Sequence, residues 1–221
     1  MIGQLFNLLA PHYCYGCGEV GSVLCRNCNY DIISERSRVC VSCRRPLGAA
    51  TCTTCPPLFH GTYMVGSRDG TLQRIVDATK FDSVREAADV QAELLAAALP
   101  RLPRLVIVPI PTIYPHVRQR GYDHTLRMAR SLAGQLDGQC ARLLERKTLS
   151  IQHGASRQER LTQAAKAFAV KGSVNAEASY LLVDDVTTTG ASLTEAAKCL
   201  RAAGARNIYV AVTTYQERND F

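Results

Sequence analysis

The stretch that decides the fold reads YLLVDDVTTTGASLTEAAKCL and spans residues 180–200. Its apolar start predicts a buried strand over residues 180–185. Two adjacent acids, Asp184 and Asp185, leave this strand at its carboxyl end. A turn of three threonines, a glycine and an alanine follows over residues 187–191. The pattern indicates a strand that ends in two carboxylates and a hydroxyl-rich turn.

The turn leads into a helix that we predict over residues 192–205. Ser192 and Glu195 have the spacing of a capping box, and Gly204 marks the end of the helix. The first N–H groups of a helix point outward, and its dipole favours an anion. Gly190 lets the backbone approach a ligand closely, and the hydroxyls add donors. The turn is therefore a candidate site for one phosphate.

The two carboxylates beside the turn accept hydrogen bonds, so they fit a vicinal diol, with or without Mg²⁺. A phosphate flanked by a diol describes a ribose 5-phosphate. The nucleotide-binding pattern G-x-x-x-x-G-K-[ST] does not occur in the sequence, and the spacing G-x-G-x-x-G occurs only at residues 16–21, among the cysteines and not between a strand and a helix. The alternative is an ordinary capped helix, with one acid on a metal or on a neighbouring arginine.

Apolar runs and helical periods alternate through the chain after residue 58. Alternation of this kind predicts an α/β fold with a mostly parallel sheet and flanking helices. Ligands of such sheets bind off the carboxyl ends of the strands. The expected strands span residues 61–67, 104–111, 140–146, 180–185 and 207–215, and the expected helices span residues 70–80, 84–99, 123–136, 156–168 and 192–205.

Eight of the ten cysteines lie in the first quarter of the chain, as four C-x-x-C pairs. Two residues between thiolates let a tight turn bring both sulfurs to one ion, so four pairs supply two tetrahedral zinc sites. The pairs group in sequence order or in a crossed order, and disulfides or a redox pair are the alternative to metal. The candidate ligands are Cys14, Cys17, Cys25, Cys28, Cys40, Cys43, Cys52 and Cys55.

The cysteine-rich part differs in kind from the remainder, and Pro56-Pro57 marks the change. We expect a double zinc ribbon over residues 1–58 and a second domain over residues 59–221. So short a first segment has little core of its own, so metal binding would supply most of its folding energy.

The net charge of +7 is concentrated between residues 101 and 166, where twelve Lys and Arg face four Asp and Glu. Such a cluster suits nucleic acid or a phosphorylated small molecule, and a solvated arginine-rich face is the alternative. No apolar run is long enough to span a bilayer, and the opening stretch lacks the basic start of a signal peptide. We therefore expect no membrane insertion and a cytoplasmic location.

The motif LLVDDVTTTGASL closely resembles the phosphoribosyl pyrophosphate loop of type I phosphoribosyltransferases. The chain as a whole resembles the ComF/GntX family, whose members join an N-terminal cysteine-rich zinc module to such a domain. Lys80, in ATKFDS, resembles the family's "lKy" position. Residues 108–124 and 148–168 are similar to its "VPvP…R.RGfNq" and "T..Q..l....R..N...aF" blocks. The resemblance implies a type I phosphoribosyltransferase-like fold.

The chain departs from the family pattern in two places. Asp123 and His124 stand where the family usually has Asn-Gln, and Gln163 stands where it usually has Asn. These changes affect the turn at residues 121–124 and leave the phosphate site intact. We interpret His124, like His153, as a polar surface residue rather than an acid–base group.

The resemblance assigns roles to the motifs. The loop residues would hold the 5-phosphate, Asp184 and Asp185 would hold the ribose hydroxyls, and Arg118 and Arg120 would contact pyrophosphate together with Mg²⁺. The implied binding residues are Asp184, Asp185, Val186, Thr187, Thr188, Thr189, Gly190, Ala191, Ser192 and Lys80, and the implied catalytic residues are Asp184, Asp185, Arg118 and Arg120.

Another part of the resemblance concerns residues 146–160, which correspond to the mobile loop that closes over the site in this fold. Gln152, Arg157 and Arg160 lie on it. Closure would exclude water from the reacting centre.

Two functions fit these features. The first is a phosphoribosyltransferase with an unknown acceptor. The second is a non-catalytic accessory protein that binds phosphoribosyl pyrophosphate and contacts single-stranded DNA or a DNA-uptake protein through its zinc module and basic segment. ComF members are linked to natural competence, the import of single-stranded DNA, which favours the second function without excluding the first.

Overall fold

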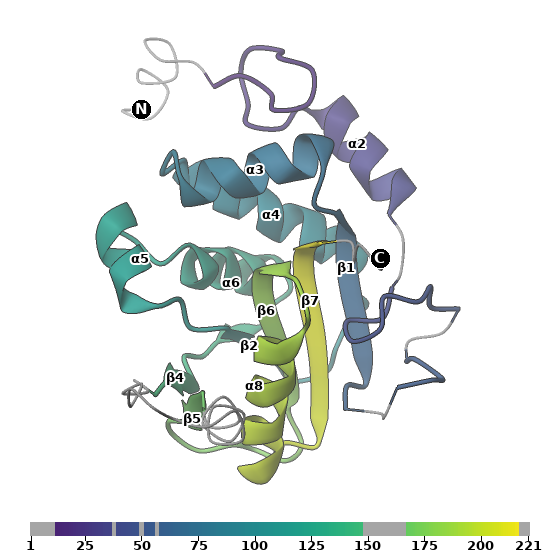
Figure 1. Ribbon diagram of the computed structural model, residues 1–221, viewed down its shortest axis with the longest axis vertical. Helices are drawn as coiled ribbons and strands as arrows, with labels where there is room; N and C mark the ends of the chain where they lie inside the picture. Colours follow the sequence, from purple (N-terminus) through teal and green to yellow (C-terminus); the bar gives the residue numbers. More distant parts are fainter. Residues whose placement is uncertain (1–11, 37–38, 49–50, 56–57, 148–166, 217–221) are drawn as a thin grey trace, which may run out of the picture.

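The computed structural model describes residues 12–36, 39–48, 51–55, 58–147 and 167–216. Within these residues the centre is a five-stranded sheet in the order β1-β7-β6-β2-β3, and all its pairings are parallel (Figure 1). The prediction of a mostly parallel sheet is confirmed. Its strands are β1 (Gly61–Ser67), β2 (Leu105–Pro109), β3 (Gln139–Cys140), β6 (Ser179–Thr187) and β7 (Asn207–Tyr215).

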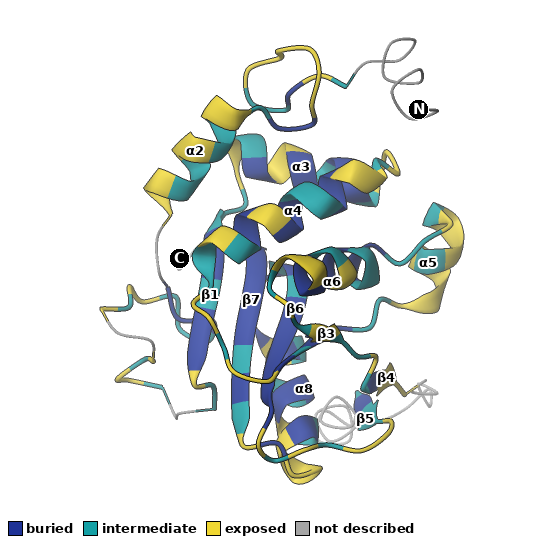
Figure 2. Ribbon diagram, turned by 180° about the vertical axis from the view of Figure 1, so that it is seen from behind, coloured by how far each residue is buried: buried dark blue, intermediate teal, exposed yellow. Residues whose placement is uncertain are grey.

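Helices flank the sheet on both faces, as the front and rear views show (Figures 1 and 2). On one face Leu94 and Leu132 meet Ile107 of β2 in a buried cluster. On the other face Leu200 packs with Leu182 of β6. The first face is covered by α3 (Gly70–Lys80), α4 (Arg85–Ala98) and α6 (His124–Gln135), and the second by α8 (Ala191–Ala202).

Strand β6 is longer than the sequence predicted. Its apolar residues are buried because it has a strand on each side and helices over both faces. Pairing with β7 continues past the acids, with Val186 opposite Thr214 and Thr187 opposite Tyr215. Asp184 and Asp185 therefore lie inside the second half of the strand, and the turn begins only after Thr187.

The predicted capping box at the start of α8 is wrong. The helix begins at Ala191, so Ser192 is already inside its first turn. The N-cap is Gly190, in the left-handed conformation with φ 75°, and no side chain caps the helix. Glu195 forms an ion pair with Lys198 at 2.7 Å instead. The predicted stop is confirmed, because α8 ends at Ala202 and Gly204 follows with φ 105°.

The middle of the chain contains elements that the sequence did not predict in this form. The expected strand over residues 140–146 is divided between β3 and β4 (Leu144–Arg146). β4 pairs antiparallel with β5 (Phe168–Val170), outside the main sheet. A helix, α5 (Tyr114–Arg120), lies between β2 and α6 and was not expected. Of the helix predicted over residues 156–168, residues 156–166 lie outside the described residues.

The eight paired cysteines form two four-cysteine modules that sit on opposite sides of the sheet. The first module, residues 12–28, places Cys14 and Val23 in the same cluster as α4 and continues into α2 (Arg26–Glu35). The second module, residues 39–55, places Val41 in the cluster of α8. Both modules thus share core with the sheet, and the division at residue 58 stays a prediction. Among the described helices, none is long and apolar enough to cross a membrane.

Candidate functional site

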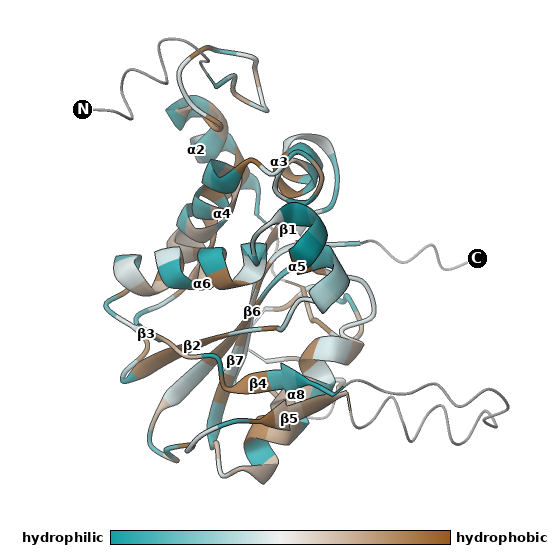
Figure 3. Ribbon diagram, turned by 90° about the vertical axis from the view of Figure 1, so that its left-hand side faces the viewer, coloured by the Kyte–Doolittle hydropathy of each residue, from teal (hydrophilic) through white to brown (hydrophobic). Residues whose placement is uncertain are grey.

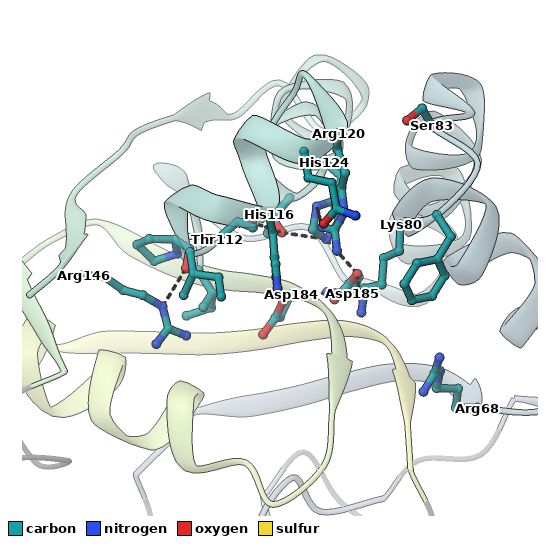
Figure 4. Close-up of a pocket in the computed structure, with 16 residues that line it drawn as sticks. Arg68, Lys80, Ser83, Thr112, His116, Arg120, His124, Arg146, Asp184 and Asp185 are labelled. Atoms are coloured by element: carbon teal, nitrogen blue, oxygen red, sulfur yellow. Dashed lines mark hydrogen bonds and ion pairs between the residues drawn. The ribbon is translucent and has the colours of Figure 1, made fainter. Parts of the chain in front are cut away.

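The main candidate site is a pocket at the carboxyl end of the parallel strands. It has a volume of about 620 Å³ and is closed on one side by Asp184 and Asp185 of β6 (Figure 4). Lys80, which the sequence analysis singled out as a candidate, lines this pocket at the end of α3. The other polar side chains that line it are Arg68, Ser83, Thr112, His116, Gln119, Arg120, His124, Thr125 and Arg146.

Asp185 is held by two cationic or donor groups inside the protein. Its Oδ2 atom lies 2.8 Å from His124 Nε2 and 2.9 Å from Lys80 Nζ. Burial alone would raise the pKa of this carboxyl, but the hydrogen bond from His124 and the charge of Lys80 outweigh it and lower the pKa. Asp185 is therefore a fixed carboxylate whose Oδ2 atom is already engaged by the protein.

His124 is a residue of this pocket that the sequence interpretation did not assign to the site. We expected His124 on the surface, but it is buried, with 4% of its surface exposed. Arg120 Nη1 lies 3.0 Å from its Nδ1 atom. Because a guanidinium can only donate, Nδ1 accepts, and the ring proton is on Nε2, which donates to Asp185. The sequence held one indication that this position is unusual: His124 departs from the Asn-Gln pair of the family that the chain resembles.

The other departure, Asp123, has a structural role. Its carboxylate accepts a hydrogen bond from Leu126 N and caps the start of α6. The same oxygen accepts from the hydroxyl of Thr112, 3.1 Å away. Asp123 therefore fixes the start of α6, whose first residue is His124. Through these two residues the turn at residues 121–124 remains in contact with the pocket.

Asp184 has a different environment from its neighbour. Its side chain is partly exposed and lines the pocket. Removal of solvent and the nearby charge of Asp185 raise its pKa well above the usual range, which the positive charge of Lys80 only partly offsets. A carboxylate that opens into a pocket beside a second acid is a suitable ligand for Mg²⁺, which would remove the repulsion between the two.

The threonine loop surrounds a second, smaller cavity next to the pocket. This cavity has a volume of about 50 Å³, and Asp184 lines both spaces. Thr189 Oγ1 accepts from Ala191 N at 3.3 Å, and Gly190 O accepts from Thr194 N at 2.9 Å. The predicted loop residues Val186, Thr187, Thr188, Thr189, Gly190, Ala191 and Ser192 all line this cavity.

Other predicted site residues are placed differently. Arg120 lies in the pocket, but its guanidinium donates to His124. Arg118 is exposed on α5, a strongly hydrophilic helix (Figure 3), and does not line the pocket. Gln152, Arg157 and Arg160 lie outside the described residues.

Two arginines in the pocket were not singled out by the sequence. Arg146 donates from Nε to Pro111 O at 3.0 Å and lies over the ring of Phe168, and Arg68 pairs with Asp77 at 2.6 Å. Arg146 stands on β4 and Arg68 directly follows β1, so only the folded chain shows that they face one pocket.

The cysteines form two groups of four whose sulfurs all lie within 4.8 Å of one another. The groups follow sequence order, so the crossed pairing is wrong. Two thiolates on a tetrahedral zinc ion, with Zn–S of about 2.3 Å, are ~3.8 Å apart. The observed Sγ–Sγ separations are 3.6 Å for Cys17 and Cys25, 3.9 Å for Cys40 and Cys55, and 3.7 Å for Cys43 and Cys52. Both groups therefore fit one zinc ion each.

Backbone N–H groups lower the pKa of one cysteine in each group. Burial raises the pKa of Cys14, but N–H donors from Cys25, Cys17 and Gly16 outweigh it and bring the pKa to about 6. Donors from Thr54 and Cys55 likewise bring the pKa of Cys52 to about 6. Each group therefore contains one sulfur whose pKa lies below that of an ordinary thiol, which favours the thiolate that zinc binds.

Comparison with known proteins gives little direct identification. No family model and no curated protein sequence matches the chain. Among solved structures, a hypoxanthine phosphoribosyltransferase from Staphylococcus aureus matches with 12% sequence identity and a TM-score of 0.34. The match covers 59% of this chain, and the chain spans 62% of the length of that enzyme. The function therefore has to be argued from the site itself.

Proposed function

We propose that the protein binds phosphoribosyl pyrophosphate with Mg²⁺ and transfers its phosphoribosyl group to an acceptor that is still to be found. The observation that carries the proposal is the position of Asp184, which lines both the small cavity of the threonine loop and the larger pocket. A ligand with a phosphate at one end, a diol in the middle and a pyrophosphate at the other end matches this order of sites.

In this proposal the chain's own residues hold the ligand. Loop N–H groups and hydroxyls bind the 5-phosphate, and the Asp184 carboxylate accepts from the ribose hydroxyls. Bound Mg²⁺ would neutralise charge on the departing pyrophosphate. Lys80 and Arg146 place positive charge in the same pocket. His124 holds Asp185 in one orientation, so the acid pair is set before the ligand arrives.

The transfer itself exchanges one bond for another at C1 of the ribose. The bond from C1 to the pyrophosphate oxygen breaks, and pyrophosphate leaves with the electron pair. A nitrogen of the acceptor forms the new bond to C1 and gives up its proton to solvent or to a base on the acceptor side. We expect this reaction to take place in the cytoplasm. We also expect the protein to be of the ComF type and therefore to be linked to DNA uptake.

A second candidate function is binding of single-stranded DNA next to the ligand site. It is favoured by helix α5, which has no buried residues and exposes 75% of Tyr114 near the exposed Arg118. An aromatic ring beside an arginine suits stacking on bases and contact with phosphates. Fluorescence anisotropy with labelled oligothymidylate tests it. Binding should weaken steeply with salt and be lost in Tyr114→Ala/Arg118→Ala.

Calorimetric titration of the zinc-loaded full chain with phosphoribosyl pyrophosphate and Mg²⁺ tests the main proposal. The wild type should bind, and Asp184→Asn/Asp185→Asn should not. Arg118→Ala is a matched control, because it removes a charge outside the pocket and should leave this binding unchanged. A folded wild-type protein that does not bind would overturn the proposal. Release of pyrophosphate with candidate acceptors then separates an enzyme from a binding protein.

A further inference from the structure

The two four-cysteine modules have the same local design, which allows a residue-by-residue comparison. In the first, Tyr13 bridges Val20 and the N–H of Gly18 donates to Cys14 O at 2.8 Å. In the second, Val39 bridges Pro46 and the N–H of Arg44 donates to Cys40 O at 3.0 Å. Each bond closes the turn around a C-x-x-C pair. Arg44 therefore occupies the position that Gly18 has in the first module.

The position requires a left-handed backbone in both modules. Gly18 has φ 81° and Arg44 has φ 63°. Glycine adopts this conformation without strain, whereas a residue with a Cβ does so at a cost of about 1–2 kcal/mol. A strained non-glycine residue that the surrounding structure maintains is a reason to look for a role of its side chain.

The side chain of Arg44 reaches the threonine loop. Its Nη2 atom donates to Thr188 O at 2.6 Å and to Thr187 O at 3.2 Å, and its Nη1 atom donates to Val41 O at 2.9 Å. The guanidinium also lies over the ring of Tyr215, 5.6 Å from its centroid. One side chain thus connects the turn of the second module to the loop that lines the small cavity.

These contacts orient the peptide groups of the loop. In a trans peptide the C=O and the following N–H point in opposite directions. Arg44 holds the Thr188 carbonyl, and it shares the Thr187 carbonyl with Gln216 N, which donates to that oxygen at 3.0 Å. The N–H groups of Thr188 and Thr189 are therefore turned to the other side of the loop. The positive charge behind the loop adds a favourable field for an anion.

A second contact joins the same two segments. A Cβ built on Gly190 would lie 2.8 Å from Val41 O, which is closer than such atoms approach. The second module therefore packs directly against the backbone at the start of α8. Val41 is one of the two residues between Cys40 and Cys43, so the metal turn itself forms part of the wall behind the loop.

We propose that Arg44 is a positioning residue for the anion site, and that the second four-cysteine module is the structural support of the threonine loop. The inference rests on the proposed function only where it names the ligand, the 5-phosphate end of phosphoribosyl pyrophosphate. Arg44 does not touch this ligand. It keeps the loop in the binding-competent arrangement, and a loop that is competent only part of the time binds more weakly in proportion.

Arg44→Gly tests this, because it places the residue type of the first module at this position, removes the side chain and relieves the backbone strain, so a loss of loop order cannot come from strain in the turn. Amide hydrogen exchange of the loop peptide, residues 186–193, should accelerate at least about tenfold, while exchange in β7 stays as in the wild type. The affinity for phosphoribosyl pyrophosphate with Mg²⁺ should fall about tenfold or more. Zinc content should stay at two ions per chain, which shows that the module still folds.

Arg45→Ala is the matched control, since Arg45 is the exposed neighbour whose side chain contacts Thr54 of its own module. It should behave as wild type in both measurements. Arg44→Lys keeps the charge without the forked donors, so it should restore part of the affinity that Arg44→Gly loses.

Two results would overturn the inference: unchanged loop exchange in Arg44→Gly, or faster exchange with unchanged affinity. If the wild type fails to bind the ligand while Arg44→Gly still accelerates loop exchange, the proposed function is wrong and the positioning role of Arg44 stands.

Discussion

The two four-cysteine modules share a turn design and differ in what they touch. The first packs on the face of α4, where Cys14, Val23 and Leu24 join the hydrophobic core. The second packs on the face of α8, where Val41 meets the backbone of Gly190 and Arg44 donates to the threonine loop. The first module therefore contributes core contacts to the domain, whereas the second also contacts the loop that we propose as the anion site.

The largest expected effect comes from removing one zinc ligand of each module. Cys43→Ser and Cys17→Ser change equivalent ligands, and each should lower the zinc content from two ions to about one. Cys43→Ser should also weaken phosphoribosyl pyrophosphate binding by about 100-fold, because the wall behind the loop loses its metal-held turn. Cys17→Ser should bind the ligand as wild type does at temperatures where it is folded. Elemental analysis and calorimetry on the same samples check both.

Equal loss of ligand binding in the two cysteine variants would contradict the comparison, because it would mean that both modules act only through overall stability. Equal retention would mean that the loop does not need the second module. A thermal melt of each variant separates these outcomes from simple unfolding.

A smaller effect is expected from adding one methyl group to a left-handed glycine near each module. Gly190→Ala should destabilise the fold by about 2–3 kcal/mol, since it combines backbone strain with a clash against Val41 O. Gly18→Ala should cost about 1 kcal/mol, because no described atom lies within 4 Å of the added Cβ. Urea unfolding of both variants measures the difference. Similar values would argue against a close contact between the second module and α8.

Strong local periodicity made most of the sheet domain predictable from sequence. The ranges of β1, β7 and α3 match those expected, because the pattern of apolar residues along the sequence reflects which residues are buried. The sequence analysis predicted β3 and β4 as one strand, because two short strands in different sheets give no separate pattern of apolar residues. The capping box failed because the loop residue Gly190 takes the N-cap position that the pattern gave to Ser192.

The site was predictable where its residues are adjacent in sequence and not where the fold gathers them. Asp184, Asp185 and the threonine loop form one segment, so their chemistry could be read together. His124 comes 61 residues before the carboxylate that it contacts, and Arg44 comes 144 residues before Thr188. A histidine or arginine in isolation is most often a surface residue, and only the tertiary structure distinguishes these two.

The smallest expected effect concerns Asp184 and Asp185 of β6, and it separates defects of the acid pair from defects of the loop. Because the pKa of Asp184 is raised in the folded protein, ionisation of this acid costs stability, and the loss grows as pH rises above about 4, where the unfolded chain ionises. Asp184→Asn removes the cost, so it should raise Tm by about 2 °C at pH 7.5 relative to wild type and by less toward pH 4. Asp185→Asn should lower Tm at pH 7.5, because Lys80 and His124 lose their partner. Melting curves across this pH range measure both, and the same sign for the two variants would refute the opposite roles of these neighbouring acids.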